Sequence, residues 1–147
     1  CSAVTFITGL ALKEFSAAGR GVLVNVASSA AFQPLPGMAV YAATKAYILS
    51  LSRSVSGEVS AIPGIRVLTV SPSGTETDFQ NAAGVKHDPG EKLLSPEFVA
   101  ERMLDAVYGK KRECVIGLTG KAMYAAARLL PVQTQIKLWK HLMRGRR

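Results

Sequence analysis

The stretch GVLVNVASSAAFQPLPGMAVYAATK, residues 21–45, decides the fold class of this chain. It opens with the apolar, valine-rich run 21–27, which is short and is typical of a buried strand in a parallel sheet. A loop containing proline and glycine separates this run from residues 38–60, whose composition and apolar spacing predict a helix. Because a strand followed by a helix is half of a βαβ unit, we expect an α/β fold.

The segments on either side continue this alternation of strands and helices. Residues 1–18 carry apolar side chains near helical spacing, and residues 65–71 and 113–118 are predicted as further strands. Ser95 and Pro96 are suited to the N-cap and first position of a helix that runs to about Tyr108. Such alternation implies a parallel sheet with right-handed crossovers.

Three residues in this part of the chain could together transfer a proton to or from a substrate. Tyr41 and Lys45 are four residues apart, so on a helix they lie one turn apart on the same face. An ammonium beside a phenol favours the phenolate, which makes Tyr41 a usable general acid or base. Ser28 follows the first strand, so its hydroxyl is expected at the carboxyl edge of the sheet, where α/β folds bind ligands. Taken singly, these residues could be a loop hydroxyl, a half-buried aromatic and a solvated lysine.

Together with a later segment, these residues resemble the second half of a short-chain dehydrogenase/reductase. The matching features are Ser28, the Tyr-x-x-x-Lys pattern that starts thirteen residues after it, and the segment from Pro72 to Thr77 that follows the next strand. The resemblance covers residues 1 to about 119. It implies the C-terminal part of a Rossmann-like, doubly wound parallel sheet, namely the last three of seven strands.

Two features of that family have no counterpart in the sequence. One is the Gly-rich strand-turn-helix motif that binds the cofactor phosphates. The other is a catalytic asparagine, which would align at or just ahead of Cys1. We therefore expect the chain to be a truncated form or a fragment of a longer enzyme.

The resemblance also implies a role for each matching residue. Ser28 would polarise a substrate carbonyl, Tyr41 would deliver the proton, and Lys45 would assist the tyrosine and bind the nicotinamide ribose. The cofactor would be NAD or NADP, whose hydride would reduce the carbonyl carbon. Besides Tyr41 and Lys45, the residues expected to contact the cofactor are Pro72, Ser73, Gly74, Thr75 and Thr77.

The substrate and the choice between NAD and NADP are less constrained. The residues around Tyr41 are nonpolar and favour an apolar ketone, such as a 3-oxoacyl thioester or a steroid-like ketone; they are Leu35, Met38, Ala39 and Val40. In the family, residues near the first two strands of the whole sheet select the cofactor, so that choice stays open. Helices 1–18 and 38–60 resemble those that pair across the family's dimer interfaces, which predicts a homo-oligomer for the complete enzyme.

Residues 78–94 form a polar stretch with no sustained apolar period. In the family the corresponding loop covers the substrate, so this stretch is a predicted lid. The alternative is a solvated connection, and His87 is expected to be a surface histidine.

Positive charge is concentrated at the C-terminal end. The chain has a net charge of +8, of which residues 120–147 carry +7 without any acidic residue. This division predicts a partial Rossmann domain over 1–119 and a basic helical tail over 120–147. The domain itself then lacks the basic patch that nucleic-acid binding needs. Apolar residues of the tail recur at helical spacing: Val132, Ile136, Trp139 and Met143. The tail is therefore a predicted basic amphipathic helix that either lies on an anionic membrane surface or docks on the enzyme or a dimer mate.

Other functional classes find little support in the sequence. No stretch approaches the roughly 20 apolar residues of a membrane span. The two cysteines lack metal-ligand or redox spacing, so we expect no metal and a cytoplasmic protein with reduced thiols, peripheral at a membrane if the tail binds one.

A second hypothesis is that the chain is a catalytically inactive remnant that acts only as an interaction or membrane-surface protein. Strand 21–27 would then lack its inner neighbour and expose a hydrophobic edge.

Overall fold

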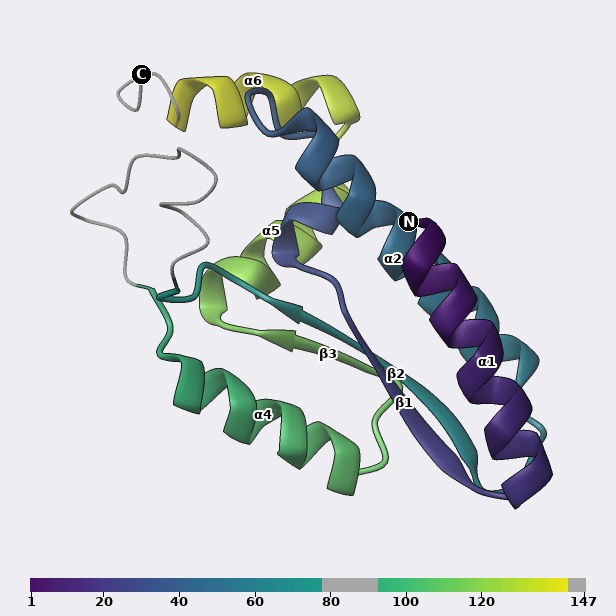
Figure 1. The fold of residues 1–147 in the computed structure, drawn as a ribbon. Helices are drawn as coiled ribbons and strands as arrows, with labels where there is room; N and C mark the ends of the chain where they lie inside the picture. Colours follow the sequence, from purple (N-terminus) through teal and green to yellow (C-terminus); the bar gives the residue numbers. More distant parts are fainter. Residues whose placement is uncertain (78–92, 143–147) are drawn as a thin grey trace.

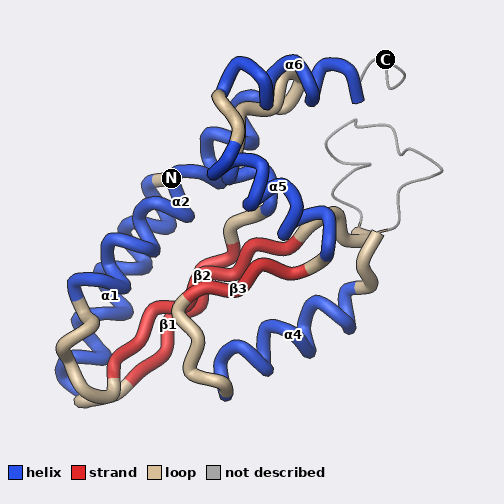
Figure 2. Tube along the Cα trace, turned by 180° about the vertical axis from the view of Figure 1, so that it is seen from behind, coloured by secondary structure: helices blue, strands red, loops and turns tan. Residues whose placement is uncertain are grey.

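The computed structural model, which describes residues 1–77 and 93–142, has three parallel strands with helices on both faces of the sheet (Figures 1 and 2). The elements in chain order are α1 (Ser2–Ala18), β1 (Gly21–Val26), the 3-10 helix η1 (Ser29–Phe32), α2 (Ala39–Glu58), β2 (Ile65–Pro72), α4 (Pro96–Tyr108), β3 (Glu113–Ile116), α5 (Leu118–Leu129) and α6 (Val132–Leu142). The predicted α/β class with a parallel sheet is confirmed.

The strands lie in the order β1-β2-β3. β1 pairs with β2 from Gly21 opposite Ile65, and β2 pairs with β3 up to Pro72 opposite Ile116. β1 ends one residue earlier than predicted. β3 ends two residues early, at Ile116, because Gly117 has a φ of 92° and serves as the N-cap of α5.

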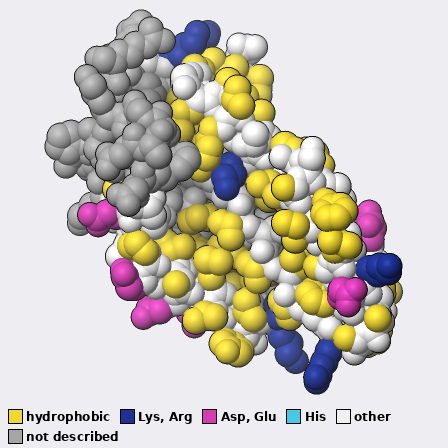
Figure 3. Space-filling model, in the orientation of Figure 1, with side chains coloured by type: hydrophobic (Ala, Val, Ile, Leu, Met, Phe, Trp, Pro, Cys, Tyr) yellow, Lys and Arg dark blue, Asp and Glu magenta, His cyan; other side chains and the backbone are white. Residues whose placement is uncertain are grey.

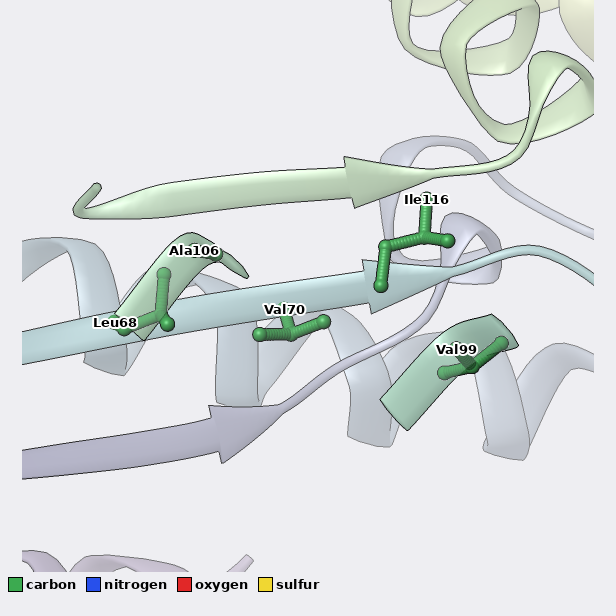
Figure 4. Packing of buried hydrophobic residues seen from close by; sticks show 5 residues of the cluster. All are labelled: Leu68, Val70, Val99, Ala106 and Ile116. Carbon is green, nitrogen blue, oxygen red and sulfur yellow. The ribbon is translucent and has the colours of Figure 1, made fainter. Parts of the chain in front are cut away.

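One face of the sheet is covered by α4. Leu68 and Val70 of β2 have no exposed surface, and they pack against side chains of α4 and β3 (Figure 4). The other members of this cluster are Val99, Ala106 and Ile116. The Ser95 hydroxyl accepts a hydrogen bond from the N–H of Phe98, so α4 begins at the predicted cap.

The opposite face is covered by α1 and α2. Val55 of α2 and Val59, the residue that caps its C-terminal end, pack against Ile65 and Val67 of β2, and Phe15 of α1 joins them. Because the two helix layers bury alternate residues of β2, both faces of this strand are buried, including the polar Thr69 and Ser71.

β1 lies at the edge of the sheet in the part of the chain that the structure describes. Its Val22 and Val26 side chains remain 40% and 42% exposed. Figure 3 shows hydrophobic side chains gathered on this side of the molecule, between α4 and α1. The open apolar edge expected for strand 21–27 is therefore present.

Two helices, α5 and α6, follow β3 and form the described part of the predicted basic helical tail. Leu130 separates them in an extended conformation (φ −102°, ψ 142°), which is the conformation favoured before a proline such as Pro131. α6 then covers residues 132–142 of the segment predicted as an amphipathic helix, and Met143 lies outside the described residues. None of the described helices is long and apolar enough to cross a membrane.

Candidate active site

Ser28 lies directly after β1, at the carboxyl edge of the sheet. Its backbone is extended (φ −171°, ψ 160°) and it caps η1, with its Oγ accepting a hydrogen bond from the N–H of Ala30 at 3.2 Å. The residue is 9% exposed. Because a serine hydroxyl can accept and donate at once, the cap fixes the oxygen while the proton can still be donated.

α2 places Tyr41 and Lys45 one turn apart on the same side of the helix. The Lys45 Nζ lies 5.8 Å from the centroid of the Tyr41 ring, within the range of a cation–π contact. The same Nζ donates a hydrogen bond to the carbonyl oxygen of Val26 at 3.2 Å. Since Val26 is two residues before Ser28, the lysine connects the tyrosine to the strand end that carries the serine.

The surroundings of Tyr41 are apolar. The half-buried Tyr41 side chain packs on a cluster built on Ala30, Leu35 and Ala42, which are between 3% and 7% exposed. The other half-buried members of this cluster, which we call the Tyr41 cluster, are Met38, Met123 and Trp139.

The segment from Pro72 to Thr77 leaves β2 at the same edge of the sheet. The N–H and the hydroxyl of Ser73 both bond to the carbonyl oxygen of Ile116, at 3.0 and 3.1 Å. The Thr75 hydroxyl donates to the Ser73 carbonyl at 3.0 Å, and Thr77 is exposed. The Ser73 side chain is thus turned toward β3.

Leu94, just before α4, holds this segment from the other side. Its N–H donates to the Gly74 carbonyl and its carbonyl accepts from the N–H of Glu76, both at 2.9 Å. Thr75 and Leu94 form a parallel bridge. The predicted cofactor segment is therefore fixed between β3 and the start of α4.

Comparison with known proteins identifies the family of this chain. A family model described as short chain dehydrogenase matches residues 1–88, which include Ser28, Tyr41, Lys45 and the segment after β2. The chain belongs to the short-chain dehydrogenase family. The resemblance inferred from the motifs is confirmed.

Three relatives illustrate the range of this family. The 2,3-dihydro-2,3-dihydroxybenzoate dehydrogenase of Escherichia coli is 40% identical over 83 residues, which are 56% of this chain and 33% of that protein. The inactive hydroxysteroid dehydrogenase-like protein 1 of Danio rerio is 33% identical over 81 residues, 50% of this chain and 25% of that protein. A short-chain dehydrogenase from Sphingobium yanoikuyae, solved in complex with NADPH, is 26% identical with a TM-score of 0.76, covering 99% of this chain and 54% of that one.

The chain spans about a third of the length of the E. coli relative and about half of the Sphingobium structure. It therefore represents one part of the short-chain dehydrogenase fold. The predicted lid, residues 78–94, and His87 fall almost wholly outside the described residues, which resume at position 93.

Two members of the Tyr41 cluster, Met123 and Trp139, were not predicted as site residues of this short-chain dehydrogenase. The sequence places Trp139 on a face suited either to a membrane or to docking. The structure buries it partly in the Tyr41 cluster, with its Nε1 donating to the Pro36 carbonyl at 3.2 Å. A signal was present in the sequence, because a single tryptophan on an amphipathic helix needs a partner for its N–H once it docks.

Burial affects the charge of the site as well. Partial burial lowers the pKa of Lys45 from its ordinary value of 10.5. Above the lowered pKa the folded protein releases this proton while the unfolded chain still holds it. The free energy of unfolding should therefore gain a positive pH slope from Lys45 between the lowered pKa and 10.5.

We expect Lys45→Met to remove this contribution. Urea unfolding at a series of alkaline pH values should show the wild-type protein gaining stability relative to Lys45→Met as the pH rises through this window. Lys13→Met, at an exposed position of α1, is the matched control and should keep the wild-type slope. Equal slopes for wild type and Lys45→Met would show that the ammonium is fully solvated.

Proposed function

We propose that this chain carries the catalytic part of an NAD(P)-dependent oxidoreductase that reduces a carbonyl or oxidises the corresponding alcohol. The observation that carries the proposal is the position of Lys45, which lies beside the Tyr41 ring and bonds to the strand end that bears Ser28. Support comes from family membership, from the dehydrogenase of E. coli and from the NADPH bound by the Sphingobium relative.

In the proposed reaction the three side chains act on one substrate oxygen. Ser28 donates its hydroxyl proton in a hydrogen bond to the carbonyl oxygen, which draws electrons away from the carbon. Tyr41 transfers its phenolic proton to that oxygen, and the Lys45 ammonium stabilises the phenolate that remains. When bound, the nicotinamide supplies the hydride for the carbon, or accepts it in the reverse direction.

The residues present fit the nicotinamide end of such a cofactor. An ammonium has three protons to donate, and the bond to Val26 uses one, so Lys45 can also bond to ribose hydroxyls. The Ser73 hydroxyl donates to the Ile116 carbonyl, so this side chain is directed into the protein. We propose that Pro72, Gly74, Thr75 and Thr77 offer backbone and hydroxyl contacts beside it.

The proposed substrate is an apolar ketone. Val40, next to Tyr41, is 78% exposed, and the half-buried Met38 adds apolar surface near it. A 3-oxoacyl thioester or a steroid-like ketone would present apolar atoms to this surface while its carbonyl meets Ser28 and Tyr41.

The complete enzyme requires a phosphate-binding half, which we propose to pair with the open edge of β1. Val22 and Val26 would then be covered, as would the unpaired side of the strand. Phe6, Ile7 and Leu10 of α1 are 67%, 58% and 48% exposed, and they support a homo-oligomer contact in the complete enzyme.

The experiment measures ketone-dependent oxidation of NADPH and NADH. The chain would be assayed alone and after mixing with a separately expressed phosphate-binding half of a family member. We expect turnover in the mixture. The absence of turnover in a mixture that forms a stable complex and binds NADPH would contradict the proposal.

A second candidate function, an inactive interaction protein, is supported by the open edge of β1. Such an edge can accept a strand from a partner chain. The relative from Danio rerio is named as inactive, so family membership is compatible with this role. This candidate function predicts that the chain and the phosphate-binding half associate stably but that their mixture does not oxidise NADPH or NADH.

Peripheral contact of a cytoplasmic protein with an anionic membrane is a further proposal for the tail. Because Trp139 is docked in the Tyr41 cluster, this proposal rests on other residues of α6. Leu138 and Leu142 are one turn apart and 48% and 58% exposed, and Lys137 and Lys140 are exposed as well.

We expect Lys137→Gln/Lys140→Gln to weaken binding to phosphatidylserine vesicles by about 30-fold, because each cation near such a surface contributes about 1 kcal/mol. Lys13→Gln, on α1, is the control. Co-sedimentation equal to wild type for the double variant, or equal binding to neutral vesicles, would exclude the contact.

A further inference from the structure

A tight turn leads from η1 into the helix that carries Tyr41. The N–H of Met38 donates to the Leu35 carbonyl at 2.9 Å, and Gly37 between them has a φ of 91°. With Pro36 at the second position and a positive φ at the third, residues 35–38 have the features of a type II turn. The Met38 carbonyl then accepts from the N–H of Ala42 at 2.9 Å, so the turn continues directly into the first turn of α2.

The central carbonyl of this turn is bound by a residue from the other end of the chain. The Pro36 carbonyl takes no part in the bond that closes the turn, and it accepts the hydrogen bond of the Trp139 indole at 3.2 Å. The indole also packs in the Tyr41 cluster with Leu35 and Ala42, which are 3% and 5% exposed. Figure 1 shows α6 lying beside the segment that enters α2.

α6 is itself held in place. Gln135 is 5% exposed, and its Nε2 donates to the carbonyl of Leu130 at 2.8 Å, between α5 and α6. α5 in turn packs on η1 through an edge-to-face contact of Tyr124 with Phe32, whose ring centroids are 5.0 Å apart. The two C-terminal helices therefore contact both ends of the segment between Ser28 and Tyr41.

We propose that Trp139 is a positioning residue, which sets the Tyr41 phenol relative to Ser28 by holding the Pro36 turn. This inference rests on the proposed function of Ser28 and Tyr41. Trp139 touches neither substrate nor cofactor in this proposal; it acts through the turn. Proton transfer depends steeply on geometry, so a displaced turn should reduce the rate of the chemical step more than it weakens binding.

The first test separates kcat from KM in the active protein. Trp139→Phe keeps an aromatic ring in the cluster but loses the N–H that binds Pro36. We expect kcat to fall about 10-fold, with KM for ketone and for NADPH within about 2-fold of wild type. Gln133→Ala, at an exposed position of the same helix, is the matched control and should behave as wild type.

The comparison with Tyr41→Phe makes the two possible failures distinguishable. If Tyr41→Phe abolishes turnover while Trp139→Phe keeps the wild-type kcat, the positioning role is wrong and the proposed function stands. If Tyr41→Phe keeps turnover, the proposed function itself fails. An equal loss of kcat in Gln133→Ala would also overturn the role, because the effect would then belong to α6 as a whole.

The second test needs no activity and begins with the unmodified chain. Trp139 is the only tryptophan, so its fluorescence emission reports directly on this contact. We expect the short-wavelength emission of a partly buried indole. Emission typical of an indole in water would overturn the inference.

Gly37→Ala tests the turn in the same measurement. A Cβ at Gly37 would meet nothing within 4 Å, so the variant changes only the backbone preference at a φ that alanine rarely adopts. We expect the Trp139 emission to move to longer wavelength and kcat to fall about 10-fold, as in Trp139→Phe. Unchanged emission together with unchanged kcat would contradict the inference.

Discussion

Replacing Tyr41 by phenylalanine should reduce turnover of the complete enzyme by about 100- to 10,000-fold, which is the usual contribution of a positioned general acid or base. The substitution removes only the phenolic O–H and keeps the ring that packs on Ala30, Leu35 and Ala42. The fold and the apolar cluster should therefore survive. NADPH affinity should stay within about 2-fold of wild type, because little of the contact surface changes.

The control for this result is Tyr108→Phe. Tyr108 ends α4 and is 80% exposed, so the same loss of a hydroxyl there should leave kcat and KM unchanged. Steady-state kinetics give the turnover, and calorimetric titration gives the cofactor affinity. A Tyr41→Phe protein that turns over at the wild-type rate would show that another group supplies the proton.

Replacing Lys45 by methionine should impair both turnover and cofactor binding. The side chain that is lost donates to the Val26 carbonyl, lies beside the Tyr41 ring and is proposed to bind the nicotinamide ribose. A hydrogen bond to a charged group is worth about 1.5 to 3 kcal/mol, which corresponds to about a 10- to 100-fold loss of NADPH affinity. kcat should fall at least about 10-fold as well, because the phenolate loses its cation.

The pattern across two variants distinguishes these roles. Tyr41→Phe should change kcat alone, whereas Lys45→Met should change kcat and cofactor affinity together. Lys13→Met removes an exposed lysine of α1 and should change neither. If Lys45→Met kept the wild-type affinity for NADPH, the lysine would have no part in holding the cofactor, and its role would be limited to the tyrosine.

The parts of the fold that the sequence predicts well are those governed by local patterns. The apolar run after Gly21 predicts β1, and the carboxyl end of that strand then determines where Ser28 lies. The four-residue spacing of Tyr41 and Lys45 is a property of any helix, so their approach follows once α2 is predicted. For the same reason the cap at Ser95 is found at the predicted residue.

The parts that the sequence does not predict depend on contacts between distant residues. The bond from Trp139 to Pro36 joins positions 103 residues apart, and no local pattern links them. The bond from Lys45 to the Val26 carbonyl likewise requires the position of the strand relative to the helix. The spacing of Val132, Ile136 and Trp139 correctly indicates an apolar face of α6. That spacing does not determine whether the face binds a membrane or packs on the Tyr41 cluster.

The boundary between β3 and α5 is also not predicted correctly from the sequence. β3 is predicted to Leu118, but the backbone at Gly117 turns the chain into α5 two residues earlier. Most of α5 lies within residues 120–147, which are predicted as a basic helical tail. Tyr124 of α5 contacts Phe32 of η1, so α5 packs on the domain, which the basic charge of this segment does not predict.

The most direct test of the central claim follows the transferred hydrogen. The complete enzyme would be incubated with an apolar ketone and NADPH that carries deuterium at both C4 positions, and the alcohol would be examined by mass spectrometry. We predict one deuterium on the carbon that bore the carbonyl, and at least about 100-fold less of this product from the Tyr41→Phe protein in the same time. Alcohol without deuterium, or labelled alcohol formed equally by Tyr41→Phe, would contradict the assignment of Ser28, Tyr41 and Lys45 as the catalytic centre.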